Sequence, residues 1–400
     1  MHYIRLLRPA KFDASDRRRP LVSLLVTVTT DLGDSFLYTN EPVDLVVSAD
    51  DAVGTSILSH ESEGQPYRWT AGMRVLDIKV PVKSHLKKGD VTCTINIQQV
   101  TRPKSFGALR SDFVLPWGIR KGSTAVDGLI MPVSVHLVAG VCEPVSVRPL
   151  QLNTGYLPSD QLNVELEEDI GESIARHIWD AGVVTACFLA GACKIEYIRN
   201  ALPISKDTFN VLELGSGVGI LGITLARIIE RAAAIQGKTL SEATILLTDL
   251  EEAEERARSN IARTEATLSC DDGDGSVVTL QYENLDWDEG KHGRFGPLVS
   301  ARPWDLVILS DCTYNVDSLP ALIGTLSALH TSNLNHMDAE KDAKTSVMLA
   351  TKPRHSSEQA LFGLLDADGW RYSVLRSIPL PKLGEEGEVV DIYSLEKGAP

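Results

Sequence analysis

An apolar run that turns through three alternating glycines into a helical pattern constrains this chain more than any other feature. Residues 211–219 read Val-Leu-Glu-Leu-Gly-Ser-Gly-Val-Gly, and Ile-Leu-Gly-Ile-Thr-Leu follows. The order predicts a strand, a tight turn and a helix that begins near Val218. Glycine suits such a turn because it has no Cβ and lets a ligand approach the backbone closely. Since the first amides of the helix point into the turn, the stretch predicts a nucleotide-type binding loop.

Two ligands compete for this loop. Gly217, Gly219 and Gly222 satisfy Gly-x-Gly-x-x-Gly, which is the dinucleotide fingerprint. With Glu213 and Gly215, the same stretch also reads Glu-x-Gly-x-Gly-x-Gly, a loop that binds S-adenosyl-L-methionine (AdoMet). A carboxylate so close to the turn suits a ligand with an ammonium and a sulfonium, and it repels a pyrophosphate. The acid therefore favours AdoMet, and a glycine-rich turn without a ligand is the third interpretation.

The composition is that of a globular protein and narrows the partners. The 400 residues are 43% hydrophobic and 23% charged, with a formal net charge of −15. No apolar run reaches the roughly 18 residues of a membrane helix, and the first residues lack a signal peptide's apolar segment. The negative charge argues against a nucleic-acid substrate and favours a cationic partner, such as a protein that presents a lysine.

The six cysteines predict the compartment and bear on metal binding. They form no Cys-x-x-Cys pair and lie mostly in apolar runs. This pattern is typical of reduced core residues rather than of zinc ligands or disulfides. We therefore expect no metal, and a location in the cytosol or nucleus.

The first 150 residues predict an all-β domain, either a sandwich or a barrel. Short β-branched runs recur between Gly, Pro and Asp, and several of them alternate. Leu76, Ile78 and Val80, for example, face one way, with Asp77 and Lys79 opposite. We find no catalytic constellation here, so both a role in substrate recognition and a purely structural role remain open.

The later residues predict a second domain of a different class. Residues 151–170, with an acidic run at Glu165–Asp169, are the expected junction, and residues 171–400 the second domain. Asp180 is the expected N-cap of the helix that follows it. From Val211 strands and helices alternate, as in an open and mostly parallel sheet. The expected strands are Val211–Leu214, Thr244–Thr248, Val277–Tyr282, Trp304–Leu309, Ser346–Ala350, Trp370–Leu375 and Val389–Leu395.

One feature of this pattern is common to AdoMet and dinucleotide folds, and a second favours AdoMet. Asp249 ends the second strand, where an acid binds ribose hydroxyls in both folds. The last two runs have no helix between them, so they should pair antiparallel. A parallel sheet that ends in an antiparallel hairpin is the arrangement of AdoMet methyltransferases, whereas a dinucleotide fold continues with another crossover helix.

Five motifs follow one another in the second domain. They are Ile178-Trp179-Asp180-Ala181-Gly182, Leu212–Gly219, Thr248-Asp249, Leu285-Asp286-Trp287 and Ser310-Asp311-Cys312-Thr313-Tyr314. Over roughly residues 160–400 the chain resembles the seven-β-strand protein-lysine methyltransferases with an Asp-x-x-Tyr motif after strand four, methyltransferase family sixteen. The resemblance implies an α/β Rossmann-like methyltransferase domain, here preceded by the all-β domain. It also implies AdoMet as methyl donor, S-adenosylhomocysteine as product and a protein lysine as acceptor.

The resemblance also implies the residues of the site. Asp311 and Tyr314 face the acceptor amine, and nine other residues hold the cofactor. The nine are Gly215, Gly217 and Gly219 beside the methionine and ribose, Glu213 at the amino end, Asp249 on the ribose, Asp286 and Trp287 at the adenine, and Trp179 and Ser310 closing the pocket.

The chemistry limits what Asp311 can do. The acceptor lysine must be neutral, which costs about 4–5 kcal/mol at pH 7 from a pKa near 10.4. Because a nearby carboxylate raises that pKa, we assign Asp311 to orienting the amine rather than to strong general-base catalysis. Tyr314 can offer its ring face to the cation. The alternative is structural: Asp311 caps the helix after strand four, and Tyr314 packs in the core.

Other functions stay open at this point. A small-molecule, nicotinamide-like N-methyltransferase uses the same fold, and a non-catalytic AdoMet-binding module retains the same loop. A nicotinamide-dependent dehydrogenase is the least favoured alternative. Cys312 and Thr313 stand where enzymes that methylate nucleic-acid bases have two prolines, which argues against those substrates.

Overall fold

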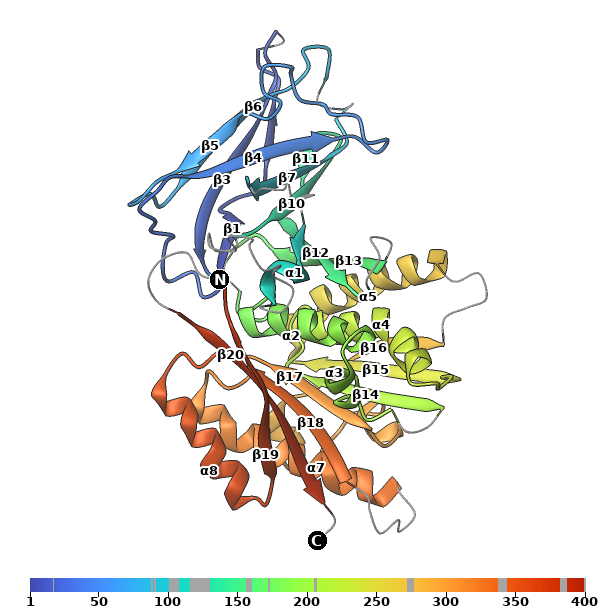
Figure 1. Ribbon diagram of the computed structural model, residues 1–400. Coiled ribbons are helices and arrows are strands. Elements are labelled where there is room, and N and C mark those ends of the chain that lie inside the picture. Colours follow the sequence, from blue (N-terminus) through green and yellow to red (C-terminus); the bar gives the residue numbers. More distant parts are fainter. Residues whose placement is uncertain are drawn as a thin grey trace. The chain divides into compact units, whose positions relative to one another are not determined.

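The computed structural model describes residues 1–398 and divides them into two compact units (Figure 1). Outside the described residues lie 17, 88, 90, 101–107, 116–129, 156–159, 172, 205–206, 272–276, 337–343 and 382–386. The first unit comprises Met1–Gln151, Asn163–His177 and Leu380–Gly387. The second comprises Leu152–Leu162, Ile178–Pro379 and Glu388–Pro400.

Strands dominate the first unit and form two sheets. The five-stranded sheet runs β2-β3-β1-β9, with β6 also on β3, and the eight-stranded sheet runs β13-β12-β10-β7-β4-β5, with β11 on β10 and β8 on β12. The strands are β1 (His2–Leu6), β2 (Lys11–Asp13), β3 (Leu21–Thr30), β4 (Val43–Asp50), β5 (Pro66–Trp69), β6 (Leu76–Pro81), β7 (Cys93–Gln99), β8 (Leu109–Arg110), β9 (Ile130–Met131), β10 (Val133–Val138), β11 (Val141–Cys142), β12 (Val145–Asn153) and β13 (Gln161–Asp169). One short helix, α1 (Ser111–Val114), lies among its described residues.

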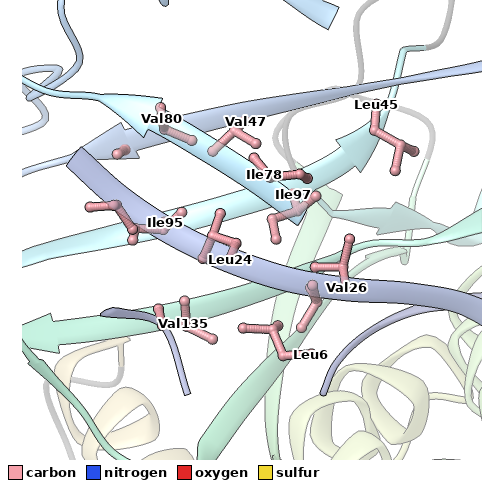
Figure 2. Close-up of a cluster of buried hydrophobic side chains, with 14 of the residues drawn as sticks. Leu6, Leu24, Val26, Leu45, Val47, Ile78, Val80, Ile95, Ile97 and Val135 are labelled. Carbon is pink, nitrogen blue, oxygen red and sulfur yellow. The ribbon is translucent and has the colours of Figure 1, made fainter. Parts of the chain in front are cut away.

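The two sheets of the first unit share one hydrophobic core. Leu24 of β3 and Ile78 of β6 belong to the same buried cluster as Val47 of β4 and Ile97 of β7 (Figure 2). The alternation in each strand explains this, because every second side chain of β4 is buried and those between are only partly buried. The first unit is thus built from two layers with the apolar faces turned inward.

The acidic run in the expected junction is part of a strand. Residues 161–169 form β13 beside β12, with Val164, Leu166 and Glu168 buried. The apolar residues at every second position are enough to set one buried face, and the acids between them face outward. Residues 156–159 of the expected junction lie outside the described part of the chain.

The second unit contains a seven-stranded sheet in the order β16-β15-β14-β17-β18-β20-β19. Its strands are β14 (Thr208–Leu214), β15 (Glu242–Asp249), β16 (Val278–Asn284), β17 (Leu306–Ser310), β18 (Lys344–Thr351), β19 (Arg371–Pro379) and β20 (Val389–Gly398). The first five are parallel to one another, and β20 is antiparallel to both β18 and β19. This mixed sheet, closed by an antiparallel hairpin, is the one that the sequence predicts.

The helices of the second unit alternate with these strands. They are α2 (Asp180–Ala190), η3 (Gly191–Cys193), α3 (Glu196–Asn200), α4 (Ile220–Ile235), α5 (Glu251–Asp271), α6 (Trp287–Gly290), η4 (Val299–Ala301), η5 (Val316–Ser318), α7 (Leu319–His336), η6 (Ser356–Gln359) and α8 (Ala360–Ala367). The strand order reverses between β14 and β17, and ligands of open α/β sheets bind at the carboxyl ends of strands at such a point. The glycine loop follows β14, so the fold puts it at this edge.

Three further observations concern the described residues alone. None of their helices combines the length and the apolar character needed to cross a membrane. No group of three or more His, Cys, Asp or Glu among them could hold a metal ion. The five cysteines with described side chains are free thiols, and the side chain of Cys270 lies outside the described residues.

Candidate active site

The glycine loop joins β14 to α4 in a conformation that other residues rarely adopt. Gly215, Gly217 and Gly219 have φ angles of +61°, +53° and +86°. A Cβ on Gly215 would lie 2.5 Å from Cys312 Sγ and 3.2 Å from the Trp287 ring. The loop therefore needs glycine for its backbone shape, and at Gly215 also for the approach of two other segments.

Glu213 belongs to β14, and its side chain contacts the first turn of α4. Its carboxyl group is only 2% exposed, and Oε2 accepts a hydrogen bond from the Gly222 amide at 2.8 Å. Burial raises the pKa of Glu213 to about 8, although amides of α4 oppose the shift. The sequence motif implies that Glu213 supports the cofactor's amino end. In the structure its contacts are with the first turn of α4, so it holds strand and helix together.

Asp249, at the end of β15, lies beside the same loop. Its Oδ2 accepts from the Gly217 amide and its Oδ1 from the Leu250 amide, both at 2.7 Å. Burial raises the pKa of Asp249, while these two amides lower it. Each carboxylate oxygen can accept more than one hydrogen bond, so Asp249 retains capacity for hydroxyl groups of a ligand.

Trp287 also reaches the loop, whereas Asp286 has a local role. Asp286 is the N-cap residue of α6 and accepts from the Asp288 amide at 2.9 Å. This bond fixes the start of the short helix that carries Trp287. The Trp287 ring is close to Gly215, as the 3.2 Å approach to a Cβ there indicates.

The Asp-x-x-Tyr motif follows β17 and packs against the glycine loop. Cys312 Sγ lies 3.5 Å from the Leu214 carbonyl and 3.9 Å from the Gly215 carbonyl. Burial raises the pKa of the Cys312 thiol well above its ordinary value, so it stays protonated and unreactive. Ser310 lies at the N-terminal end of α2, because a Cβ on Gly182 would lie 3.4 Å from its Oγ.

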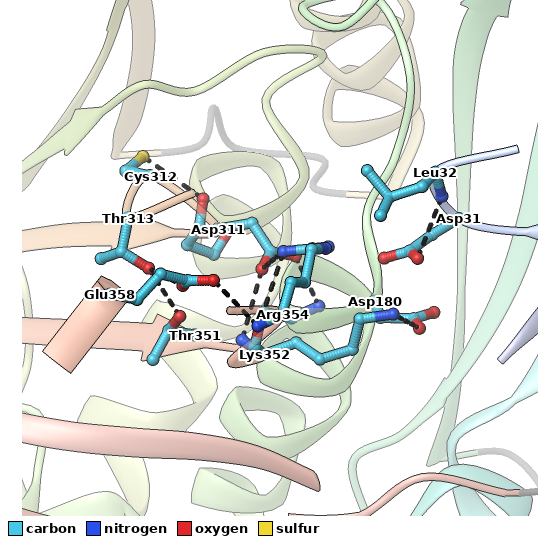
Figure 3. Close-up of polar contacts among 12 residues, drawn as sticks. Asp31, Leu32, Asp180, Asp311, Cys312, Thr313, Thr351, Lys352, Arg354 and Glu358 are labelled. Carbon is cyan, nitrogen blue, oxygen red and sulfur yellow. Dashed lines mark hydrogen bonds and ion pairs between the residues drawn. The ribbon is translucent and has the colours of Figure 1, made fainter. Parts of the chain in front are cut away.

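Asp311 is strained and buried. Its φ is +53°, one of two positive values among the described non-glycine residues, and it is 6% exposed. Its Oδ2 accepts from the Ala181 amide at 2.9 Å, at the start of α2. Its Oδ1 accepts from Arg354 Nη1 at 2.8 Å and from the Lys352 amide at 3.3 Å (Figure 3). Asp311 thus serves the N-terminus of α2, and not the helix after β17 that the structural alternative names.

The cap of α2 differs from the prediction. Trp179 is the N-cap residue and its side chain accepts no capping bond, while Asp180 is the first helical residue. The Asp180 carboxylate instead pairs with Lys352 Nζ at 2.8 Å, in a site where both side chains are almost fully buried (Figure 3). A buried cation is a stronger partner for a buried carboxylate than an amide is, so this ion pair takes precedence over local capping.

Lys352 and Arg354 are the residues of this cluster that motif analysis does not assign. Both follow the carboxyl end of β18, and that position was their only signal in the sequence. Lys352 Nζ also lies 3.2 Å from Glu388 Oε1. The Arg354 guanidinium lies over the Trp179 ring, 5.6 Å from its centroid. Arg354 therefore connects Trp179 with Asp311.

Tyr314 lies at the surface rather than in the core. It is 51% exposed, and partial burial raises the pKa of its hydroxyl. The structural alternative for this residue, packing in the core, does not match this exposure. Among the eleven predicted site residues, the glycines, Asp249, Trp287 and the Asp-x-x-Tyr segment come together at one sheet edge, while the Glu213 and Asp286 side chains accept hydrogen bonds from nearby backbone amides.

The residues at this edge fit AdoMet. Ser216 in the loop is 5% exposed, and its Oγ has no hydrogen-bond partner among the described residues, so the hydroxyl can serve a ligand. Asp249 can accept from ribose hydroxyls, and the indole of Trp287 offers a flat apolar surface. The loop itself presents no Cβ at its three glycines.

Comparisons with known proteins identify one family through its family model. The family model described as lysine methyltransferase matches residues 158–368. A Schizosaccharomyces pombe protein, UPF0665 family protein C23C4.06c, is 29% identical over 230 residues, which are 58% of this chain and 55% of the relative. The chain thus spans about half the length of this curated relative.

Solved structures also match the chain. TYW2 of P. horikoshii in complex with MeSAdo is 12% identical, with a TM-score of 0.31 over 65% of this chain and 74% of that one. TYW2 of M. jannaschii in complex with AdoMet is 12% identical, with a TM-score of 0.29 over 63% and 87% of the two chains.

Proposed function

The chain belongs to the lysine methyltransferase family, whose methyl donor is AdoMet, and we propose that its acceptor is the side-chain amine of a lysine in a protein. One observation carries the proposal. The Asp-x-x-Tyr segment after β17 is in contact with the glycine loop through Cys312, so an acceptor held by the motif would lie beside a ligand of the loop. Methyl transfer requires such alignment of donor and acceptor.

The residues at the carboxyl edge of the sheet that fit AdoMet are the ones that we expect to hold it. The backbone of the glycine loop would lie along the ligand, Asp249 would accept from the ribose hydroxyls, and Trp287 would cover the adenine. When bound, AdoMet supplies a methyl group activated by the sulfonium. Trp179 and Ser310 stay predictions for this pocket, as does a direct contact of Glu213, whose carboxyl would act through the start of α4.

The surroundings of Asp311 support a role in orienting the amine. An isolated carboxylate next to the acceptor would raise the lysine pKa and make the neutral amine harder to form. Arg354 offsets this charge at 2.8 Å, and the amides of Ala181 and Lys352 satisfy further lone pairs. A carboxylate held in this way can still accept one hydrogen bond from the amine without strongly favouring its protonated form.

Tyr314 supports the choice of a cationic acceptor. Its ring is half exposed and follows Asp311 by three residues, so it can line the entrance through which a lysine side chain would pass. An aromatic face attracts an ammonium group before deprotonation and a methylated ammonium afterwards.

The proposal is tested by incubating the purified protein with tritiated AdoMet and a cell lysate. We expect label in protein bands, and loss of that label with the Asp249→Ala variant. Label found only in the small-molecule fraction would favour a small-molecule N-methyltransferase and contradict the proposal. Binding of S-adenosylhomocysteine without any transfer would favour a non-catalytic binding module.

A further inference from the structure

A pocket of about 320 Å³ lies at the same edge of the sheet, away from the glycine loop. It lies between the carboxyl end of β18, the start of β20 and the segment that leads into α8. None of the residues predicted to hold the cofactor lines it. Thr313, which precedes Tyr314 in the Asp-x-x-Tyr segment, does line the pocket. The pocket therefore adjoins the acceptor motif from the side of β18.

One wall of the pocket is aromatic. Phe362 of α8 packs on Tyr393 of β20, with ring centroids 5.3 Å apart, and on Tyr372 of β19 at 5.0 Å. Phe362 is only partly buried, so part of its ring remains accessible beside Tyr393. Leu361, which is buried, closes the base of this wall.

The polar part of the lining carries an excess of negative charge. Glu358 and Asp391 both line the pocket, and within the described residues neither is part of an ion pair. Glu358 accepts from Thr313 Oγ1 at 3.0 Å and from the amides of Arg354 and His355, as Figure 3 shows in part. Asp391 accepts from Ser377 Oγ at 2.5 Å. These partners are neutral groups, so both negative charges lack a neutralising cation.

The two basic residues in the pocket lining, Arg354 and His355, do not reverse that balance. The guanidinium of Arg354 is paired with Asp311 at 2.8 Å, which cancels its charge towards the pocket. His355 Nδ1 lies 2.7 Å from Ser357 Oγ and acts in the cap of η6. The pocket thus combines aromatic faces with carboxylates, which is the combination that binds organic cations.

We propose that this pocket binds an arginine or lysine side chain that lies near the target lysine in the substrate protein. The proposal rests on the proposed function, because it places a second substrate residue beside the acceptor motif. A formal net charge of −15 on the chain would draw basic segments to the protein. The enzyme would therefore prefer lysines within basic sequences.

The test measures binding without methyl transfer. A fluorescein-labelled peptide with one lysine flanked by arginines is compared with a peptide in which neutral citrulline replaces each arginine. Fluorescence anisotropy is recorded at physiological salt, which screens non-specific attraction. We expect the wild type to bind the arginine peptide about tenfold more tightly than the citrulline peptide.

Three variants test whether the pocket is responsible for the preference for the arginine peptide over the citrulline peptide. Asp391→Asn and Phe362→Leu should each reduce the ratio to about threefold or less, whereas Asp366→Asn, an equal charge change at an exposed position of α8, should leave it at the wild-type value. If Asp391→Asn does not fold, Phe362→Leu alone tests whether the pocket binds the basic side chain. Equal ratios in the wild type and the pocket variants, or an equal loss with Asp366→Asn, would overturn the proposal. Methyl transfer measured in parallel separates this failure from a failure of the proposed function.

Discussion

Two buried glutamates, one in each unit, lie in opposite electrostatic surroundings. Glu168 of the first unit is 1% exposed and Glu213 of the second is 2% exposed. Burial raises the pKa of both carboxyls, but for Glu168 the Arg148 guanidinium, His177 and Arg5 together outweigh burial and hold the pKa well below its usual value. Among the described residues, the Glu213 carboxyl has backbone amides and no cation as partners, so burial raises its pKa to about 8.

The difference between the two glutamates shows that buried charge has a different role in each unit. Arg148 donates to Glu168 at 2.6 Å and to the carbonyls of Ile4 and Pro132, so one ion pair joins several strands of the first unit. In the second unit the cations Lys352 and Arg354 gather at the sheet edge, beside the strained Asp311, and not at Glu213. Burial of a charged group therefore does not mark a site by itself. The position of Asp311 at the sheet edge and its positive φ are what single it out as a candidate site residue.

The largest expected effect comes from breaking the pair in the first unit. Glu168→Ala leaves the buried guanidinium of Arg148 without its carboxylate, which costs about 3–5 kcal/mol in the free energy of unfolding. Urea denaturation followed by circular dichroism measures this cost. The matched control is Asp44→Ala, which removes an exposed pair with Arg68 and should change the stability by less than about 1 kcal/mol. Similar losses of stability for both variants would show that the buried pair does not hold the strands of the first unit together.

The next effect concerns the charged cluster at the sheet edge. Asp311→Asn removes the charge that we propose orients the acceptor, and we expect kcat/KM for methyl transfer to fall about 100-fold, or about 2.7 kcal/mol. Thermal stabilisation by S-adenosylhomocysteine should persist, because Asp311 is not among the residues proposed to hold the cofactor. An unchanged rate would assign Asp311 to the structural cap of α2 alone.

At this sheet edge, the sequence predicts residues that directly follow a strand better than it predicts contacts between residues far apart in the chain. The glycine loop and Asp249 at the end of β15 are readable because each lies directly after its own strand. The partners of Asp180 and Asp311 are not readable in this way, since Lys352 and Arg354 are far from them in the sequence and come close only in the folded domain. Capping rules assign Asp180 to its own helix, and they contain no information on a cation that a neighbouring strand brings near. The strand β13 is hidden in the same way by the acids of its outer face.

The third prediction tests the opposite pH dependence of the two glutamates. A carboxyl whose folded pKa is raised binds more protons in the folded than in the unfolded state, so it lowers stability as pH rises from about 4.5 to about 8. Glu213→Gln should therefore gain stability relative to the wild type across this range, by upwards of about 1 kcal/mol at pH 8. Thermal unfolding at a series of pH values measures the difference.

Glu168 supplies the internal contrast for that series. Its folded pKa is lowered, so its contribution is present above the unfolded pKa and is lost as the pH falls through the acid range. Glu168→Gln should thus converge with the wild type at acid pH. Parallel pH curves for the Glu213 and Glu168 variants would contradict the assignment of different partners to the two residues.

The smallest predicted effect is a shift in a pH profile. Arg354→Met leaves the charge of Asp311 without its guanidinium, which raises the pKa of a nearby acceptor amine. The rise of kcat/KM with pH should move to higher pH by about one unit, and Arg354→Lys should restore part of the shift because it keeps the charge. A variant that loses activity equally at every pH would give Arg354 a purely structural role.

The central claim, methyl transfer to a protein lysine at the edge formed by β14 and β17, is tested most directly by peptide mass spectrometry. Lysate proteins are incubated with the purified enzyme and AdoMet that carries a deuterated methyl group. We predict that the heavy methyl appears on lysine side chains and is missing when Asp311→Asn replaces the wild type. Heavy methyl on no lysine, or in equal amounts with both enzymes, would contradict the account.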